Sequence, residues 1–544
     1  MNESNILIER NQKTKAQILK KNLKIKVNIN KNYVIKKQAR NKYISFTVGI
    51  LAFIILCTII IIKFKNKNNL KLKKITTRKT PTKIKTINTL EEIYKYIESS
   101  YENNYNKTEC NELDPINIFK KRLTSESRTL CSNDDSNHIC FKDDNPIFVA
   151  THGVSCEFKN VIIDPSKWRG DGNTYKGPMD PSNRGCPLLS KGFFNIKCKS
   201  GEKYSYNGYD FIYNNYFNGW NYDYKDYENE KEQLEELAPG KTVFFISRNQ
   251  DSPNLYHGGS EFVNAIAIMY LLKLNPEDIQ IVFLESILIM DDPFYDLYKE
   301  LIGRGGEPIH VRNLTKKYLV KKGIHIPINW DSPCFINASP PNCYNNPTKT
   351  YYLYNELIDK YIVPQNYIDI INKKNPEVFY YPETIIKEGT KNENSFNKIL
   401  TFQWRRVWPK GRNGQYRILG NGPELADKLS SLLPKNILLR LIDTASLPIK
   451  QQISIMRNTD YFVGIHGAGL SLSIYAPKNC IYHEVLHSPN MNGLELFAAL
   501  SGHKVYKDII SADVKQIDGN ENIFFNVDEF AKTVVRHLKE SNLM

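Results

Sequence analysis

The clearest hydrophobic pattern lies in the second half of the chain, where short apolar runs alternate with amphipathic stretches. The runs of buried-strand length are 242–247, 279–284, 399–402, 437–442, 461–465, 480–485 and 504–506. The stretches predicted as helices are 260–274, 423–433, 449–457, 493–500 and 527–538, the first with Ser260 as its N-cap. Apolar strands that alternate with helices indicate parallel sheets with helices on both faces. We therefore expect an α/β fold with two lobes.

The first half of the chain has a weaker pattern. Residues 89–135 are polar, with a possible short helix at 90–97, and residues 136–235 are rich in Tyr, Asn, Gly and Cys, with a strand-like piece at 147–150. Residues 303–395 look irregular, with Pro and Asn punctuation. We therefore predict an N-terminal lobe at 136–395 with a Cys-rich lead-in, and a C-terminal lobe at 396–544.

Residues 43–62 form a run of uncharged, mostly apolar residues. At 1.5 Å per residue, this run is long enough to cross a hydrocarbon core of about 30 Å. A signal peptide would start at the N-terminus and have a shorter apolar core, and a buried core helix would not have Lys and Arg crowded at both ends. The pattern predicts a single transmembrane helix at 43–62 between a basic tail (1–42) and a solvated stem (63–135).

The charge distribution agrees with this division. The chain has 544 residues and a net charge of +16, from 74 Lys and Arg and 58 Asp and Glu. Residues 1–85 hold 22 of the basic and two of the acidic residues, so the remaining 52 basic and 56 acidic residues give the rest a net charge of −4. A mildly acidic body argues against a surface that tracks nucleic-acid phosphates.

The number of basic residues does not indicate the orientation of the anchor, because it is nearly equal on the two sides. The cysteines are the better evidence. Nine of the ten cysteines follow the span, and their spacings are compatible with disulfides in an oxidising lumen. The candidate local pairs are Cys131 with Cys140, Cys186 with Cys198, and Cys334 with Cys343. N-glycosylation sequons occur at Asn106, Asn313 and Asn337. We expect a cytosolic tail and a luminal body, in the membrane of the Golgi or the endoplasmic reticulum.

The most informative segment runs from Asp460 to Glu484. A buried strand ends in Gly464-Ile-His466-Gly467-Ala468-Gly469-Leu470, where a helix begins. Glycines at such a turn let backbone N–H groups approach an anion, and the helix N-terminus favours negative charge. Glu484 ends the next strand, where a carboxylate can accept hydrogen bonds from ribose hydroxyls. A tight turn without a ligand is the alternative interpretation.

Two further segments follow predicted strands. Arg405, Arg406, Arg412 and Arg417 come after the strand at 399–402, and guanidinium groups suit the paired oxygens of a diphosphate. His257 and Glu261 come after the strand at 242–247, and either could accept a proton from an acceptor hydroxyl. Solvated arginines and a structural histidine are the alternatives. No Asp-x-Asp triplet, a common metal-binding element of sugar-nucleotide enzymes, occurs in the chain, so we expect no metal.

At these residues the chain resembles glycosyltransferase family 61, which includes EGF-domain O-GlcNAc transferases and β-1,2-xylosyltransferases. The elements that carry the resemblance are Val463–Leu470 with Pro477 and Glu484, the Arg405-Arg406 pair with Arg417, Asn421 and Glu424, and Asn254-Leu255-Tyr256-His257. One branch of the family has Asp where this chain has Glu261, which puts the role of that carboxylate in doubt.

The resemblance implies a GT-B fold of two Rossmann-type lobes and an inverting, metal-independent transfer of GlcNAc or xylose from a UDP-sugar to a glycoprotein or glycan. It places the donor diphosphate at Arg405, Arg406, Arg417 and the turn His466, Gly467, Ala468, Gly469 and Leu470, with Glu484 nearby. His257 and Glu261 are the candidates for the base. The alternative function is a non-catalytic, membrane-anchored module that binds glycan or protein on the same fold.

Overall fold

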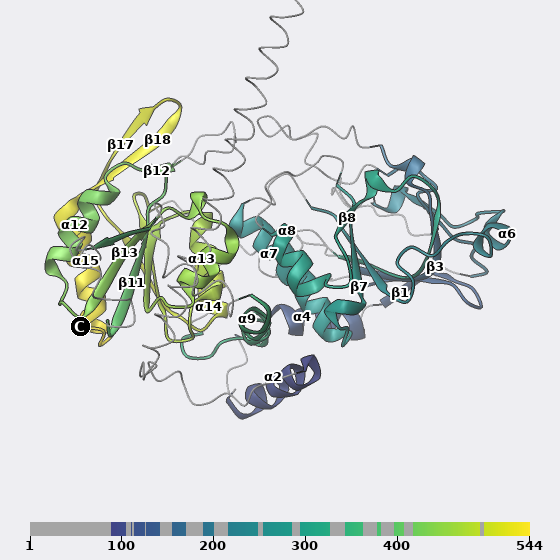
Figure 1. Ribbon diagram of the computed structural model, residues 1–544, viewed down its shortest axis with the longest axis horizontal. Helices are drawn as coiled ribbons and strands as arrows, with labels where there is room; N and C mark the ends of the chain where they lie inside the picture. The colour runs from purple at the N-terminus through teal and green to yellow at the C-terminus, as the bar shows by residue number, and fades with distance from the viewer. Residues whose placement is uncertain are drawn as a thin grey trace, which may run out of the picture. The chain divides into compact units, whose positions relative to one another are not determined.

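The predicted alternation of strands and helices forms two large sheets and one small sheet in the computed structural model (Figure 1). The structure describes residues 89–104, 110, 112, 114–125, 127–141, 155–169, 189–200, 216–248, 254–285, 294–326, 343–362, 378–381, 396–406, 417–489 and 494–544. The predicted tail, the predicted anchor and the strand-like piece at 147–150 lie outside these residues. Among the described helices, none has both the length and the apolar character needed to span a bilayer.

The first sheet combines an antiparallel and a parallel part. Its order is β1 (Ser127–Ser132), β2 (Asn137–Phe141), β3 (Ser155–Ile163), β9 (Tyr318–Ile326), β6 (Thr242–Ile246), β7 (Ile279–Phe283) and β8 (Ile309–His310), with β4 (Phe194–Asn195) and β5 (Trp220–Asn221) attached to β3. Strands β9, β6, β7 and β8 are parallel, whereas β3 pairs antiparallel with β9. The Cys-rich lead-in therefore extends this sheet.

The two faces of the first sheet are covered differently. One face packs on helices α2 (Leu90–Asn104), α4 (Pro115–Ser125), α7 (Leu255–Leu271) and α9 (Lys349–Tyr361) and on a π-type turn, η3 (Tyr298–Ile302). The other face packs on aromatic side chains of the lead-in, including Phe194 and Trp220, whose rings stack at 4.7 Å. The prediction of helices on both faces is wrong for this sheet, because the lead-in supplies strands and aromatic rings there. Helices α2 and α4 fall within the range predicted as a stem, yet they belong to this core.

The second sheet has the predicted arrangement. Its order is β10 (Val378–Tyr381), β13 (Ile437–Ile442), β11 (Lys398–Gln403), β14 (Tyr461–Ile465), β15 (Ile481–Leu486) and β16 (Lys504–Ile509). Figure 1 shows α12 (Gly422–Leu432) and α15 (Val527–Glu540) on one face, and α13 (Ile449–Met456) and α14 (Leu496–Leu500) on the other. All pairs are parallel except that of β10 with β13.

The order of the parallel strands locates a binding crevice. Strand β11 lies between β13 and β14. The connection from β11 leads to β13 on one side of it, and the connection from β13 leads back to β14 on its other side. At such a switch point, the carboxyl ends of the two central strands leave a crevice in which doubly wound sheets bind ligands. In the second sheet this crevice lies beyond Gln403 of β11 and Ile465 of β14.

Three predicted elements differ from the structure in their local detail. Helix α7 begins at Leu255, capped by the side chain of Asn254, so Ser260 lies inside the helix and donates to the carbonyl of Tyr256. The predicted helix after β14 is a 3₁₀-helix, η8 (Ala468–Tyr475). The range 303–395 is not irregular, because it contains β8, β9, α9 and β10.

The smaller elements complete the described structure. They are η1 (Pro165–Lys167), α6 (Tyr227–Lys231), η2 (Pro276–Asp278), α8 (Tyr295–Leu297), η4 (Val311–Asn313) and η7 (Thr444–Ser446), and a small sheet of β12 (Arg417–Leu419), β18 (Asn520–Phe525) and β17 (Ala512–Ile517). The hairpin of β17 and β18 was not among the predicted elements.

The cysteines pair over longer distances than predicted. Disulfides join Cys110 to Cys343, Cys131 to Cys198 and Cys140 to Cys156, and Cys480 is a buried free thiol. The predicted local pairs are therefore wrong, because Cys131, Cys198 and Cys343 each have another partner. The pairing follows the strands and not the spacing in the sequence. Strands β2 and β3 are antiparallel neighbours, and their register places Cys140 opposite Cys156. Cys186 and Cys334 lie outside the described residues.

Candidate functional site

The crevice of the second sheet holds the first of the predicted arginines. Arg405 follows β11, and its guanidinium donates a hydrogen bond from Nη1 to the carbonyl oxygen of His466 at 2.8 Å. Burial, and after it the positive charge of Arg417, lowers the pKa of Arg405 to about 10. The group is therefore still charged at neutral pH, and it joins the ends of the two strands that flank the switch point.

The glycines of the turn after β14 accommodate side chains from β11. A Cβ atom on Gly467 would lie 1.4 Å from Nη1 of Arg405, and one on Gly469 would lie 1.6 Å from Nε2 of Gln403. Gly467 is extended, with φ of 163°, so its requirement for glycine comes from the neighbouring guanidinium and not from backbone strain. The turn is thus built around Arg405 and Gln403, and η8 begins directly after it.

His466 and Glu484 form the next layer of the site. Nδ1 of His466 lies 2.5 Å from Oε1 of Glu484, whose side chain is fully buried. The backbone N–H of Leu494 donates to Oε2 of Glu484 at 3.2 Å, and the hydroxyl of Tyr482 donates to the same oxygen at 3.4 Å. The predicted carboxylate at the end of β15 therefore points to the same crevice, where it orients the histidine of the turn.

Arg417 and His487 are two further titratable groups at the rim of the crevice. Arg417 begins β12, and burial lowers its pKa, while the carboxylates of Glu521 and Glu484 oppose that shift. Burial also lowers the pKa of His487, and the charges of Arg417 and His466 act in the same direction, opposed by Glu521. Because these groups affect one another's pKa, Arg405, Arg417, Glu484 and His487 lie around one site.

Arg406 differs from the other predicted arginines. Its side chain is 45% exposed, its Nη1 lies 3.5 Å from Oδ2 of Asp443, and its guanidinium lies over the ring of Trp404. It therefore lies at the edge of the crevice, bound to protein groups. Arg412 falls outside the described residues.

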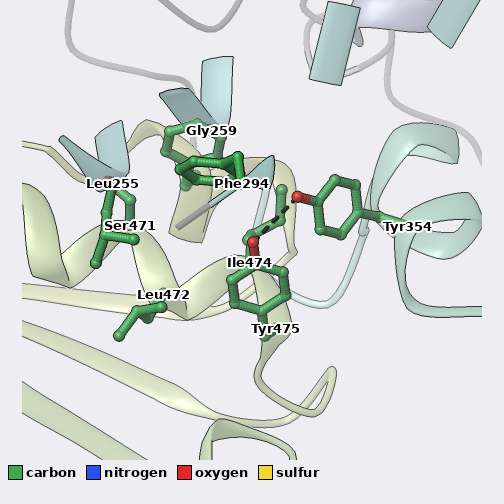
Figure 2. Close-up of a pocket in the computed structure, with 9 residues that line it drawn as sticks. Leu255, Gly259, Phe294, Tyr354, Ser471, Leu472, Ile474 and Tyr475 are labelled. Carbon is green, nitrogen blue, oxygen red and sulfur yellow. Dashed lines mark hydrogen bonds between the residues drawn. The ribbon is translucent and has the colours of Figure 1, made fainter. Parts of the chain in front are cut away.

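The predicted acid–base residues lie on α7, which packs against η8. Leu255 and Gly259 of α7 line a small apolar cavity together with Ser471, Leu472 and Ile474 of η8 (Figure 2). His257 lies in the first turn of α7, where burial lowers its pKa to about 4. The first turn also contacts α14, because the rings of Tyr256 and Phe497 meet edge to face at 5.6 Å. Helix α7 thus places His257 close to η8, the helix that follows the glycine turn.

Glu261 is buried, with 1% of its surface exposed, one helical turn after His257. Because α7 begins at Leu255 and not at the predicted Ser260, both residues lie within the helix, four positions apart. Leu470 is fully buried and belongs to the core, and Ala468 packs at its border. Of the sequons, Asn313 is exposed in η4, while Asn106 and Asn337 lie outside the described residues.

Three site residues were not predicted. Gln403 ends β11 and donates from Nε2 to the hydroxyl of Thr444 at 2.9 Å, while His487 follows β15. Arg248 follows β6 and forms a buried ion pair with Glu285, which follows β7. The signal that could have identified all three is position alone, since each is a polar residue just at or past the carboxyl end of a parallel strand.

Two groups of side chains within the described ranges have the composition of a metal site. His138, Cys140 and Cys156 form one, but both of its cysteines are in a disulfide and have no thiolate to offer. His483, Asp508 and His537 form the other, on the far side of β15 from Glu484. The disulfide therefore removes both sulfur ligands from the first group, whereas the second group keeps all three of its candidate ligands.

Part of the chain matches a known family. Residues 310–482, from β8 into β15, match the family model Glycosyltransferase 61. This stretch includes Arg405, Arg417 and the turn from His466 to Leu470, so the match agrees with the family resemblance found in the sequence.

One similar protein is the EGF domain-specific O-linked N-acetylglucosamine transferase of Drosophila melanogaster. The two sequences are 23% identical over 278 residues, which is 48% of this chain and 44% of the relative. The match thus spans less than half of the relative's length.

Proposed function

We propose that the protein is a glycosyltransferase that transfers a sugar from a UDP-sugar to a hydroxyl group of a glycoprotein or glycan. The observation that carries the proposal is the position of Arg405, partly buried at the switch point beside Arg417 and held by the carbonyl of His466. Two neighbouring, partly buried cations attract an anion. A diphosphate fits this requirement, because guanidinium groups bind its paired oxygens.

The same groups would assist the departure of UDP. In an inverting transfer, the acceptor oxygen attacks the anomeric carbon from the side opposite the diphosphate, and the bond to the diphosphate oxygen breaks. Negative charge then grows on the leaving group, where Arg405, Arg417 and the N-terminus of η8 stabilise it. Because these groups supply the charge, the proposal requires no divalent metal at the diphosphate.

His257 and Glu261 are the proposed groups that receive the proton of the acceptor hydroxyl. With a pKa of about 4, His257 is neutral at physiological pH and therefore free to accept a proton, although it is a weak base in the free protein. Glu261 lies one turn further along the same helix and is more deeply buried. A loss of activity in His257→Gln with retained binding of UDP would support His257, and the corresponding result for Glu261→Gln would support the carboxylate.

The donor sugar is proposed to be GlcNAc or xylose. The name of the Drosophila relative, which specifies N-acetylglucosamine and EGF domains, favours GlcNAc and a protein acceptor. The two large sheets, each with polar residues just past the carboxyl ends of its parallel strands, suit a GT-B arrangement in which donor and acceptor bind to different lobes.

Binding of nucleotide tests the proposal directly. The full chain, purified in detergent with EDTA present, should show a higher melting temperature with UDP or a UDP-sugar. Arg405→Ala should weaken UDP binding at least tenfold, since it removes a charged group from a buried anion site. Arg304→Ala is the matched control, because Arg304 forms a partly exposed ion pair with Glu277 and should leave the affinity unchanged. A chain that binds no UDP-sugar would instead be a non-catalytic binding module.

A type II topology, with the body in the lumen of the Golgi or the endoplasmic reticulum, is part of the proposal. Three disulfides and an exposed sequon at Asn313 support an oxidising compartment. Asn313→Gln should remove one glycan, visible as a mobility shift that is lost after treatment with a glycosidase. An unglycosylated chain with reduced cysteines in cells would contradict the luminal placement.

A further inference from the structure

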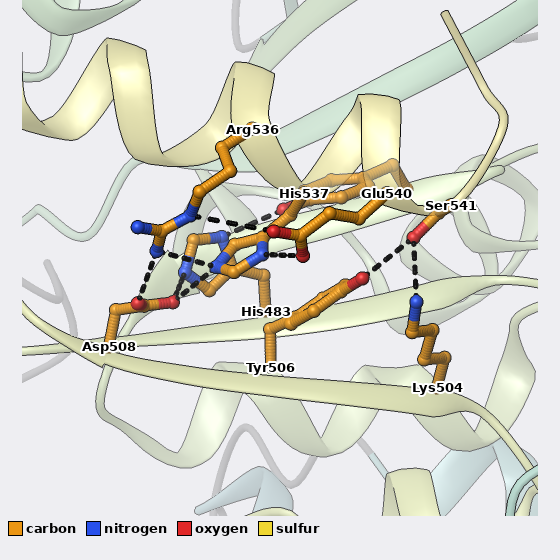
Figure 3. Close-up of polar contacts among 9 residues, drawn as sticks. His483, Lys504, Tyr506, Asp508, Arg536, His537, Glu540 and Ser541 are labelled. Atoms are coloured by element: carbon orange, nitrogen blue, oxygen red, sulfur yellow. Dashed lines mark hydrogen bonds and ion pairs between the residues drawn. The ribbon is translucent and has the colours of Figure 1, made fainter.

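A second polar cluster lies on the face of β15 opposite Glu484. His483 of β15, Asp508 of β16 and His537 of α15 converge there, as Figure 3 shows. Nε2 of His483 lies 3.0 Å from Oδ2 of Asp508, and Nε2 of His537 lies 2.6 Å from the same oxygen. Since successive residues of a strand point to opposite faces, the sheet separates this cluster from the crevice that holds Glu484.

The three ligand atoms are close enough to share one metal ion after a modest rearrangement. They all lie within 4.8 Å of one another, and the two distances from nitrogen to oxygen are 3.0 and 2.6 Å. Bonds of about 2.0–2.1 Å from Zn²⁺ to nitrogen or oxygen place tetrahedral ligand atoms about 3.3 Å apart. Small rotations of the side chains would therefore bring both Nε2 atoms and Oδ2 into the first coordination sphere of one ion.

Each histidine is also held through its other ring nitrogen. Nδ1 of His483 lies 2.8 Å from the hydroxyl of Tyr461, and Nδ1 of His537 lies 3.0 Å from Oε2 of Glu540. Partners of this kind orient metal-binding histidines so that Nε2 faces the ion. The ring of Tyr506 stacks on His537 at 3.7 Å and further restricts its rotation.

One polar atom in the cluster points to a missing ligand. Nε2 of His483 is fully buried, and its contact among the described residues is with Oδ2 of Asp508 at 3.0 Å, an approach that lacks the geometry of a full hydrogen bond. A buried polar atom without a partner is costly, and most such atoms in native proteins have a protein, water or ion partner. A cation between the three side chains would satisfy it.

Arg536 is the group that competes with a cation. Its Nη2 lies 3.0 Å from Oδ1 of Asp508 and 3.4 Å from Nε2 of His537, but the side chain is 56% exposed. The guanidinium contacts the other oxygen of Asp508, and it can turn to solvent without burying a charge.

We propose that His483, Asp508 and His537 bind one Zn²⁺ ion, with water as the fourth ligand. Two imidazoles and a carboxylate are ligands that Zn²⁺ accepts. The ion links β15 and β16 to α15, the final helix, so its role is to fasten that helix to the sheet. The site is separate from the proposed donor site, and it does not depend on the proposed activity.

The zinc content of the full chain tests this proposal. Protein without an affinity tag, exposed to a small excess of Zn²⁺ and then desalted, should retain about one zinc per chain by mass spectrometry of the metal. His537→Gln and Asp508→Asn should each lose it. Arg536→Gln is the matched control, because it removes a contact of Asp508 but no ligand, and it should retain zinc or bind it more tightly.

Cobalt provides a measurement that does not rely on variants that fold poorly. Co²⁺ added to the wild-type chain should produce the visible absorption bands of a tetrahedral site, and Zn²⁺ should displace them. Zinc should also raise the melting temperature relative to EDTA, because an ion that binds only the folded state stabilises it. A wild-type chain with no retained zinc, no cobalt bands and no effect of EDTA would overturn the proposal and leave a hydrogen-bonded His–Asp–His cluster.

Discussion

Gly467 shows how one residue controls the geometry of the candidate site. The position of its missing side chain is occupied by the guanidinium of Arg405, which bonds to the neighbouring carbonyl of His466. From the sequence, the glycines of this turn were expected to let a ligand approach the backbone. In the structure they first admit Arg405 and Gln403, and these side chains in turn form the wall of the crevice.

Gly467→Ala should therefore displace Arg405 and weaken the binding of UDP at least tenfold. Isothermal titration with UDP measures the effect. Gly259→Ala is the matched control, because a Cβ at Gly259 would lie in ordinary contact with Phe294, 3.5 Å away. Unchanged affinity in Gly467→Ala would show that the position of Arg405 does not matter for binding.

Buried neutral histidines predict a loss of stability in acid. Burial lowers the pKa of His257 and of His503 to about 4, from an ordinary value of 6.5. The unfolded chain binds more protons between these values, so the free energy of unfolding falls as the pH drops from 6.5 towards 4. Each histidine should contribute about 2 kcal/mol of this loss between pH 7.5 and pH 5.

Urea unfolding of the wild type and of His503→Gln at the two pH values measures this contribution. The variant should have the smaller difference between them, because it lacks one of the groups that must be protonated. An equal pH dependence in both proteins would mean that His503 does not titrate in this range.

At the scale of elements, the start of α7 determines where His257 lies. The side chain of Asn254 accepts a hydrogen bond from the N–H of Tyr256 at 3.0 Å and caps the helix. The predicted start at Ser260 placed His257 in a loop, because 251–259 reads as polar and glycine-rich. The helix begins earlier because Tyr256 and Gly259 pack on the rings of α14 and Phe294.

Asn254→Ala should lower the free energy of unfolding by about 1 kcal/mol, the usual cost of losing an N-cap. Asn254→Asp keeps the acceptor and adds a charge that favours a helix N-terminus, so its stability should match that of the wild type. Urea denaturation of the three proteins distinguishes these outcomes. Equal losses in both variants would argue that the amide group, and not the cap, is required.

The elements that escaped prediction have identifiable causes. Strand β9 contains Lys321, Lys322 and Gly323, which interrupt its apolar run, yet a Cβ at Gly323 would lie 2.1 Å from the ring of Phe158 on β3. The glycine is thus part of the sheet, where it makes room for an aromatic ring. The hairpin of β17 and β18 has few buried side chains, and Val514 and Ile517 are exposed, so it lacks the pattern of a core strand.

For the whole molecule, the sequence predicted the second sheet better than the first. Strands β11, β13, β14 and β15 are mostly apolar because they are buried on both faces, and their carboxyl ends could be placed together by topology alone. The crevice with Arg405, His466 and Glu484 followed from that rule. The first sheet depends on aromatic packing and disulfides between distant segments, and no local pattern specifies these contacts.

The disulfides should contribute unequally to the stability of the whole chain. The bond between Cys110 and Cys343 closes a loop with a sequence separation of 233, against 16 for Cys140 and Cys156. Chain entropy predicts losses of about 5 and about 3 kcal/mol, respectively, on removal. The double Ser variants of each pair, compared by urea unfolding, should follow this order. A reversed order would show that strain or residual structure, and not loop length, dominates.

The long disulfide also has a consequence for synthesis. At about 5–20 residues per second, Cys343 is made about 10–50 s after Cys110. Throughout that interval Cys110 is a thiol without its partner, and Cys131, Cys140, Cys156 and Cys198 are all synthesised before Cys343. A growing chain can therefore form wrong pairs that must be exchanged before the first sheet closes. The yield of native protein should depend on a catalyst of disulfide exchange in the compartment where the chain folds.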